Sequence, residues 1–214
     1  MPRTSVYQRL GKRLFDLLAA ASILIVISPV MLLIGFCSRL FLGKPMLFQQ
    51  ERPGCREKPF TICKFRTMHD LKDSQARLLP DGQRLNRFGA FLRRTSLDEL
   101  PEFWNVLRGD MSLVGPRPLL MRYLPFYTPE ERIRFTVRPG ITGWAQVNGR
   151  NEASWDDRLR KDVWYVRNQS FMLDMRILWM TVVRVARREQ VIVDARSAML
   201  NLDEERVGLR VDRV

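Results

Sequence analysis

Histidine is almost absent from this chain of 214 residues, because His69 is the only one. The three cysteines are Cys37, Cys55 and Cys63, and no two of them form a CxxC pair. This odd number and spacing argue against a disulfide framework and a structural zinc site, and they indicate free thiols in a reducing compartment. With so little histidine, any acid–base chemistry has to rest mainly on carboxylates.

The sequence also has no internal repeat, no low-complexity segment and no zinc-finger or glycine-aromatic RNA-binding signature. What it has in excess is positive charge, with a formal net charge of +13. This charge predicts an anionic partner, which is nucleic acid, anionic lipid or a phosphorylated substrate. Because the arginines are spread along the chain, the charge alone does not favour nucleic acid. The 46% of hydrophobic residues can form a core, and the length suits one domain.

The longest uncharged run extends from Leu17 to Ser38 and is apolar. It has the ~20 residues that a membrane-spanning helix needs, and it is too long for a cleavable signal peptide. Ser28-Pro29 interrupts it, and Pro29 has no N–H for the carbonyl of Ile25, so we expect a kink or break there. The Ser28 hydroxyl can bond to a carbonyl one turn earlier and ease the bend.

Basic residues stand on both sides of this run. Those before it are Arg9, Lys12 and Arg13, and those after it are Arg39, Lys44 and Arg52. The positive-inside rule places both flanks on the cytoplasmic side, which favours a re-entrant helix that bends at Ser28-Pro29 and returns. Spanning helices also contain proline, so the residues alone leave a simple span open.

The rest of the chain predicts an α+β fold that is mostly helical. A β-hairpin is expected from Met46–Glu51 and Pro59–Phe65, and loops are expected over residues 70–87 and 138–150. Helices are expected over Phe88–Arg94, from Ser96 to before Gly109, and over Ser154–Val166, and residues 190–195 suggest a strand. Residues 170–188 form an amphipathic helix that lies either at the membrane interface or in the core.

Chemistry is concentrated between Arg93 and Pro118, where Asp98-Glu99 is surrounded by arginines. Ser96 and Glu99 have capping-box spacing, so the acid pair could do no more than cap a helix. Alternatively, adjacent residues diverge by about 100° on a helix and suit two roles. One acid could attack phosphorus while the other holds Mg²⁺ near a bound phosphate. Four arginines could neutralise a diphosphate, namely Arg93, Arg94, Arg108 and Arg117, the last stiffened by Pro116 and Pro118.

Further motifs occur in a fixed order along the chain. They are Lys12-Arg13-Leu14-Phe15-Asp16, Ser28-Pro29, Lys64-Phe65-Arg66-Thr67-Met68, Thr95-Ser96-Leu97-Asp98-Glu99-Leu100-Pro101, Asn105-Val106-Leu107, Gly109–Pro118, Arg138–Trp144 and Asp162-Val163-Trp164-Tyr165. On these motifs the chain resembles the small monotopic phosphoglycosyl transferases of bacteria, also called bacterial sugar transferases. The resemblance covers most of the chain, from residue 12 to residue 187.

The resemblance implies transfer of a phospho-sugar from a UDP-sugar to polyprenyl (undecaprenyl) phosphate, with release of UMP. Asp98 matches the family's nucleophile, which forms a covalent phospho-sugar intermediate in a ping-pong mechanism, and Glu99 matches the ligand of the catalytic Mg²⁺. The residues assigned to substrate binding are Lys64, Arg66, Arg93, Pro116, Arg117 and Pro118. Ser28-Pro29 matches the pair that makes the membrane helix re-entrant, so both termini are expected to be cytoplasmic.

The expected protein is therefore a monotopic protein on the cytoplasmic face of the inner membrane. Residues 1–44 would form the basic N-terminus and membrane helix, residues 45–189 the catalytic domain with interfacial helices, and residues 190–214 a tail of unknown role. The expected partners are a UDP-sugar, polyprenyl phosphate and anionic lipid, without nucleic acid, and a homo-oligomer is left open. Without a multi-span N-terminal region, the chain fits the minimal form of the family.

The resemblance places the reaction at the first membrane step of a bacterial surface glycan, which is an exopolysaccharide, a capsule, an O-antigen or a glycoprotein. The residues do not specify the sugar. Two other functions are kept as alternatives. One is a single-span membrane tether with a basic domain that binds nucleic acid, and the other is a membrane Mg²⁺-dependent phosphohydrolase that uses the same aspartate.

Overall fold

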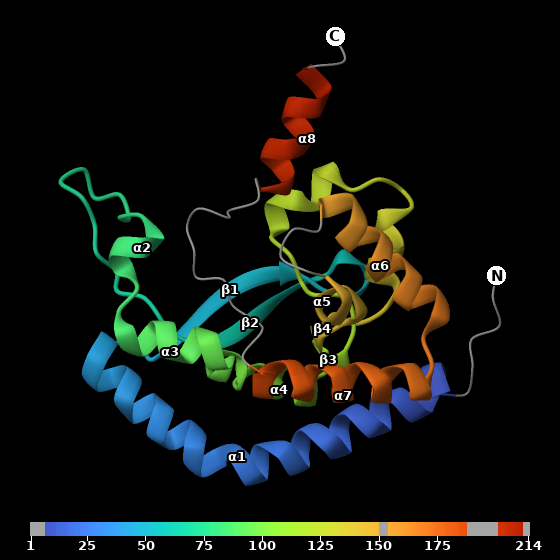
Figure 1. Ribbon diagram of the computed structural model, residues 1–214, viewed down its shortest axis with the longest axis horizontal. Helices are drawn as coiled ribbons and strands as arrows, with labels where there is room; N and C mark the ends of the chain where they lie inside the picture. Colours follow the sequence, from blue (N-terminus) through green and yellow to red (C-terminus); the bar gives the residue numbers. More distant parts are fainter. Residues whose placement is uncertain (1–6, 150–153, 188–200, 212–214) are drawn as a thin grey trace.

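The computed structural model describes residues 7–149, 154–187 and 201–211. A long helix, α1 (Lys12–Leu42), follows the short helix η1 (Tyr7–Gly11) and runs along one side of a small domain (Figure 1). The domain elements up to the acid pair are β1 (Leu47–Pro53), η2 (Cys55–Glu57), β2 (Pro59–Phe65), α2 (Asp81–Arg84), α3 (Arg87–Thr95) and η3 (Leu97–Glu99). Those after it are α4 (Glu102–Arg108), β3 (Ser112–Val114), η4 (Met121–Phe126), η5 (Glu131–Thr136), β4 (Gly140–Thr142), α5 (Trp144–Asn148), α6 (Trp155–Asn168), α7 (Phe171–Arg187) and α8 (Leu202–Val211).

Helix α1 contains Pro29 in its interior and is visibly bent (Figure 1). The Ser28 hydroxyl donates to the carbonyl of Ile25 at 2.9 Å, as expected from the sequence. Its length and composition would allow α1 to cross a membrane, and only 11% of its most apolar 18-residue segment is buried. Ten large apolar side chains of α1 are exposed, namely Leu14, Leu18, Ile25, Val26, Val30, Leu32, Leu33, Phe36, Leu40 and Phe41.

Both halves of α1 nevertheless contact the same domain. Near its start, the Arg13 guanidinium donates to the carbonyls of Val106 at 2.6 Å and Leu107 at 3.0 Å, which are the last-turn carbonyls of α4. Near its end, Ile34 is buried in a cluster with Phe65 of β2. The helix is thus attached to the domain on both sides of its bend.

The predicted hairpin is confirmed. Strands β1 and β2 pair antiparallel, with Leu47 opposite Phe65 and Pro53 opposite Pro59. A second, parallel pair joins β3 to β4, with Ser112 opposite Gly140. The loop predicted over residues 138–150 is therefore wrong for β4 and α5. The backbones come so close that a Cβ on Gly140 would lie 2.0 Å from the Gly115 nitrogen, so only glycine fits there.

Two predicted helices are confirmed and one boundary is wrong. Helix α3 includes the predicted residues, and α6 begins after Ser154, whose side chain accepts from the Asp157 N–H. The helix expected from Ser96 instead begins at Glu102, because Ser96 has a φ of 55° and ends α3. A turn of helix, α2, occurs in the loop predicted over residues 70–87. The strand expected at residues 190–195 lies outside the described residues.

Helix α7 has one face in the core and one face exposed. Asp174 and Ile177 are fully buried, and Asp174 accepts hydrogen bonds from Lys12 at 2.7 Å and from Tyr165 at 2.7 Å. In contrast, the side chain of Trp179 is 69% exposed. Of the two alternatives expected for this helix, the core position is correct for the face with Asp174 and Ile177. The face with Trp179 is apolar and uncovered.

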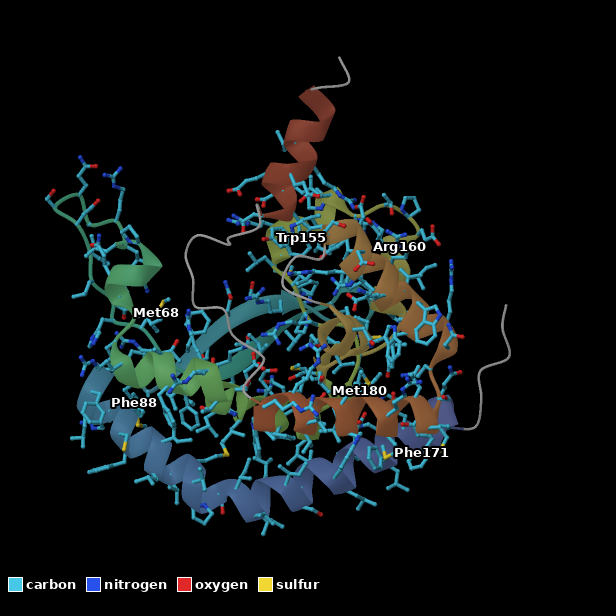
Figure 2. The ribbon with its side chains drawn as sticks, viewed as in Figure 1. Met68, Phe88, Trp155, Arg160, Phe171 and Met180 are labelled. Carbon is cyan, nitrogen blue, oxygen red and sulfur yellow. The ribbon has the colours of Figure 1, made fainter. Side chains whose placement is uncertain are left out.

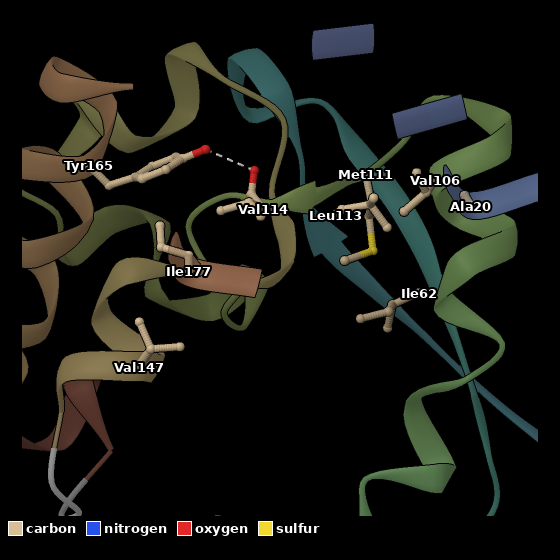
Figure 3. Close-up of a cluster of buried hydrophobic side chains, with 9 residues drawn as sticks. All are labelled: Ala20, Ile62, Val106, Met111, Leu113, Val114, Val147, Tyr165 and Ile177. Atoms are coloured by element: carbon tan, nitrogen blue, oxygen red, sulfur yellow. Dashed lines mark hydrogen bonds between the residues drawn. The ribbon is translucent and has the colours of Figure 1, made fainter. Parts of the chain in front are cut away.

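The main core lies between α1, the hairpin and α4 to α7. Figure 3 shows its nine buried side chains, among which the Tyr165 hydroxyl donates to the Val114 carbonyl at 3.1 Å. A second cluster contains Leu202 of α8, which is fully buried and packs with the buried side chains of Tyr123 and Trp155. Helix α8 is therefore packed on the domain at the end that lies away from α1 (Figure 1).

Candidate active site

Three carboxylates gather where α3 gives way to α4. Asp98 and Glu99 lie on η3, and Glu102 is the first residue of α4. The capping box predicted for Ser96 and Glu99 is wrong, since Ser96 makes no side-chain cap here. Its left-handed backbone closes α3 and Pro101 starts a new helix, so the acid pair sits on a tight turn between two helices.

Two cations hold Glu99 in place. Lys64 of β2 lies with its Nζ 2.6 Å from Glu99 Oε1 and 3.0 Å from Glu102 Oε1. Arg117 Nη2 lies 2.5 Å from the same Glu99 oxygen. Neither cation engages the second oxygen, Oε2, of Glu99. The adjacent Asp98 has no hydrogen-bond or ion-pair partner for its carboxylate among the described side chains, so the two acids do have different surroundings.

Arg117 is positioned through its backbone. It follows β3 in Gly115-Pro116-Arg117-Pro118, in which both prolines are buried. The Arg117 carbonyl accepts from Arg134 Nη2 at 2.6 Å, and the same guanidinium is ion-paired to buried Asp162 at 2.8 Å. This support from η5 and α6 was missed in the sequence, because Arg134 and Asp162 are 28 residues apart and share no motif.

The surroundings push the three carboxylates in different directions. Burial and the negative charge of Glu99 raise the pKa of Asp98 to about 6. Burial, and after it the negative charge of Glu99, also raises the pKa of Glu102. For Glu99, burial is outweighed by the positive charges of Arg117 and Lys64, which hold its pKa well below the usual range. Near neutral pH, Glu99 is a paired anion and Asp98 is a largely ionised carboxylate without a fixed cation.

An open cleft of about 2320 Å³ is lined by Lys64, Asp98, Glu99 and Arg117, while Glu102 is buried beside it. Arg93 also lines it, and its Nε donates to the Thr67 hydroxyl at 3.0 Å. Arg66 is a lining residue as well, but its guanidinium donates to the carbonyls of Met68 and Lys44, both at 2.8 Å. The structure thus brings Lys64, Glu99 and Arg117 into direct contact and places Arg93 and Arg66 elsewhere on the wall.

Glu102 is a site residue that the sequence reading missed. Its side chain is 2% exposed, and it shares Lys64 with Glu99. The available signal was spacing, since Glu99 and Glu102 are three residues apart and such residues share a helix face. The capping-box spacing of Ser96 and Glu99 gave a competing explanation that involves Glu99 alone.

The oxygen donors of this site suit a magnesium ion that is held by few protein ligands. Within the described ranges, no group of three or more His, Cys, Asp or Glu side chains is arranged to hold a metal. Magnesium normally uses one or two carboxylates and completes its shell with water and substrate phosphate oxygens. Glu99, with Oε2 free of the two cations, could supply such a carboxylate, and Asp98 is adjacent to it in the chain.

The chain thus combines an exposed apolar helix, long enough to cross a membrane, with a cleft that holds unequal carboxylates among cations. The model of the family described as "Bacterial sugar transferase" matches residues 7–188. The chain belongs to this family of transferases, as the motifs of its sequence suggested.

Individual relatives agree with this assignment. The chain is 55% identical over 174 residues to the "Uncharacterized sugar transferase EpsL" of Bacillus subtilis, covering 81% of this chain and 86% of that protein. It is 40% identical over 186 residues to the "UDP-glucose:undecaprenyl-phosphate glucose-1-phosphate transferase" of Escherichia coli, covering 82% and 40%. It is 37% identical over 200 residues to the "Undecaprenyl-phosphate galactose phosphotransferase" of Salmonella typhimurium, covering 85% and 41%. The chain thus spans about two fifths of the length of these last two proteins.

Proposed function

We propose that this chain transfers a sugar 1-phosphate from a UDP-sugar to undecaprenyl phosphate and releases UMP. The observation that carries the proposal is the unequal acid pair, in which Glu99 is ion-paired to Lys64 and Arg117 while Asp98 has no such partner. Family membership and the names of the Escherichia coli and Salmonella relatives support the same reaction. These two relatives are named for different sugars, so we propose a UDP-hexose as the substrate class.

Two displacements at one phosphorus atom would complete the transfer. First, an Asp98 carboxylate oxygen attacks the sugar-bearing phosphorus of the UDP-sugar, the bond from that phosphorus to the bridging oxygen breaks, and UMP leaves with the electron pair. Second, a phosphate oxygen of the lipid attacks the same phosphorus and Asp98 leaves as carboxylate. The products are UMP and a sugar diphospholipid. A bound Mg²⁺ would neutralise negative charge on the diphosphate, with Glu99 as its protein ligand.

The side chains around Asp98 fit these steps. Lys64 and Arg117 would orient the diphosphate and stabilise charge on the leaving phosphate, with Arg93 on the same wall of the cleft. Pro116 and Pro118 would keep Arg117 in place. Arg66 would act mainly by joining the loop after β2 to the segment before β1, because its donors bind the carbonyls of Met68 and Lys44.

We also propose that α1 is re-entrant and that the chain is monotopic, with both termini on the cytoplasmic face of the inner membrane. The support is that both ends of α1 contact one domain. A straight helix of 31 residues is about 46 Å long, and it would carry one end to the opposite side of the bilayer. Cysteine labels before residue 12 and at Lys44 should then react from the same side, whereas opposite sides would indicate a simple span.

The reaction is tested with the full chain in lipid nanodiscs containing undecaprenyl phosphate, Mg²⁺ and one UDP-sugar at a time. We expect lipid-dependent UMP release that is lost in Asp98→Asn and retained in Asp156→Asn, which changes an exposed aspartate of α6. Trapping with radiolabelled UDP-sugar in the absence of lipid should label the wild type and not Asp98→Asn. Retained turnover in Asp98→Asn would remove this residue as the nucleophile, and free sugar phosphate without lipid product would indicate a phosphohydrolase.

A further inference from the structure

Arg52 is a half-buried cation in the cleft with no counter-ion. It lies near the end of β1 and lines the cleft together with Lys64 and Arg117. Its Nη2 donates to the Gln50 side-chain oxygen at 2.6 Å, while its buried Nε has no hydrogen-bond acceptor. Among the described residues, no carboxylate lies within ion-pair distance of its guanidinium.

Two other inward-facing arginines, in contrast, have carboxylate partners. Arg134 is paired with Asp162 at 2.8 Å, and Arg206 is paired with Glu131 at 2.6 Å. Removing a cation from water without a partner costs free energy, so Arg52 does not stabilise the fold through its charge. Burial, followed by the positive charge of Arg117, lowers the pKa of Arg52, and the opposing effects of Tyr123, Glu102 and Tyr127 do not offset this. The guanidinium of Arg52 therefore lacks a directly bonded anion, which a bound ligand could supply.

The strand register places Arg52 on the wall that carries Lys64. Phe48 is opposite Lys64 and Arg52 is opposite Phe60, and alternate residues of a strand share a face. Lys64, Gln50 and Arg52 therefore lie on the same face of the hairpin. Four residues along a strand correspond to about 13 Å, so the backbone of Arg52 lies about that far along the hairpin from the level of Lys64.

The direction of this displacement is away from the membrane helix. Strand β1 begins shortly after the end of α1, and it runs toward η4 on the far side of the domain (Figure 1). Residues of η4 contact β1 there. A lipid phosphate would enter near α1, whereas a soluble nucleotide can extend into the part of the cleft that Arg52 lines.

On the basis of the proposed function, we propose that Arg52 binds the uridine-linked phosphate of the UDP-sugar, together with Arg117. The sugar-linked phosphate would then lie at Asp98, and the nucleotide would extend along the hairpin away from the membrane. The guanidinium has donors in a fixed fork that matches two phosphate oxygens, and its unused Nε is one of them. Binding would supply the anion that the folded chain lacks at this position.

UMP is the decisive probe because it carries only the phosphate in question. Calorimetric titration of the full chain in nanodiscs with Mg²⁺ should give a UMP affinity that is about ten- to hundredfold weaker in Arg52→Gln. The affinity for UDP should fall by a similar factor in this variant, and the affinity for uridine should not change. The UMP affinity of Arg52→Lys should lie between those of the wild type and Arg52→Gln, since lysine keeps the charge but lacks the paired donors of the guanidinium. Lys58→Gln, which removes an exposed charge from the same hairpin, should match the wild type.

Thermal unfolding separates a binding role from a structural one. Without nucleotide, Arg52→Gln should unfold at the same temperature as the wild type or higher, since an unpaired charge is removed. A lower unfolding temperature that accompanies weaker UMP binding would make Arg52 a structural residue and overturn the inference. Unchanged UMP affinity would also overturn it, even if the KM for undecaprenyl phosphate rose. A wild-type chain that binds no UMP and releases none would overturn the proposed function itself.

Discussion

At the scale of single residues, Lys64 organises the acid cluster. It is the one described side chain that contacts both Glu99 and Glu102, and its own side chain is 17% exposed. Arg117 contacts Glu99 only. Without Lys64, Glu102 would keep a buried carboxylate with no cation in ion-pair contact, whereas Glu99 would still be paired with Arg117. The consequences for stability should therefore depend on Glu102.

We expect Lys64→Met to lower the free energy of unfolding by about 3 kcal/mol, because it leaves a partner charge buried. The loss should be at the low end for buried pairs, since the raised pKa of Glu102 allows it to take up a proton. The double variant Lys64→Met/Glu102→Gln should recover most of the loss. Denaturant unfolding of the full chain in detergent measures both, and Lys58→Met serves as the exposed control. An equal loss in the single and double variants would contradict this coupling.

The sequence predicted some of these residues and not the contacts between them. Asp98 and Glu99 are adjacent, so their spacing was visible. The position of Lys64 depends on the hairpin register, and that of Arg117 depends on the parallel pairing of two three-residue strands. Such short strands have no periodicity of their own to detect. The error at Ser96 had a similar cause, because a serine followed by a glutamate three residues later fits a cap whatever its backbone does.

At the scale of helices, α1 combines a break in its hydrogen bonding with two attachment points. Pro29 removes one backbone bond and Ser28 binds the carbonyl of Ile25. The bend lets the two halves reach opposite ends of the domain. The sequence predicted this helix well, because the apolar run and its internal proline are both visible within the segment itself. It did not predict α8, whose position depends on contacts with η4, η5 and α6.

Removing the break in α1 should change its topology. In Ser28→Ala/Pro29→Leu the backbone bond to Ile25 is restored, and a straight helix of this length favours a full span. Cysteine labels on the two flanks of α1 should shift from one side of the membrane to opposite sides in a measurable fraction of molecules. Ser28→Ala alone should shift fewer. Same-side labelling in the double variant would mean that contacts with the domain, rather than Pro29, determine the topology.

Docking of α8 should depend on pH through Glu131. Burial raises its pKa, but hydrogen bonds from Arg206, at 2.6 and 2.9 Å, and from the Thr128 N–H hold it below the usual range. A depressed carboxylate pKa stabilises the fold above the unfolded value, near 4.3, and this stability is lost as the pH falls through the folded value.

We therefore expect Arg206→Gln to destabilise the chain by about 1–2 kcal/mol at pH 7. The difference from the wild type should shrink as the pH falls below about 4. Unfolding temperatures measured across this range are the test, with Arg122→Gln as a control, because the Arg122 side chain is 54% exposed. A difference that stays constant down to pH 3 would contradict a role for ionised Glu131.

At the scale of the molecule, apolar exposure is concentrated on one side. Helix α1 exposes ten large apolar side chains, and Trp104 of α4 and Trp179 of α7 are 57% and 69% exposed. These three helices lie next to one another along the lower edge of the molecule (Figure 1). Arg160 of α6 projects from the other part of the domain (Figure 2). This arrangement fits the proposed monotopic placement, in which the domain would lie on the bilayer surface beside α1.

The surface arrangement predicts which positions contact lipid. Single cysteines at Trp104, Trp179 and Arg160, in a chain whose three native cysteines are replaced by serine, can carry a fluorescent label. In vesicles with brominated lipid, we expect strong quenching at positions 104 and 179, because a bilayer would cover their exposed apolar side chains. Position 160 should show little quenching. Equal quenching at all three positions would contradict a fixed orientation, and none at position 179 would leave α7 as a core helix with one solvent-exposed face.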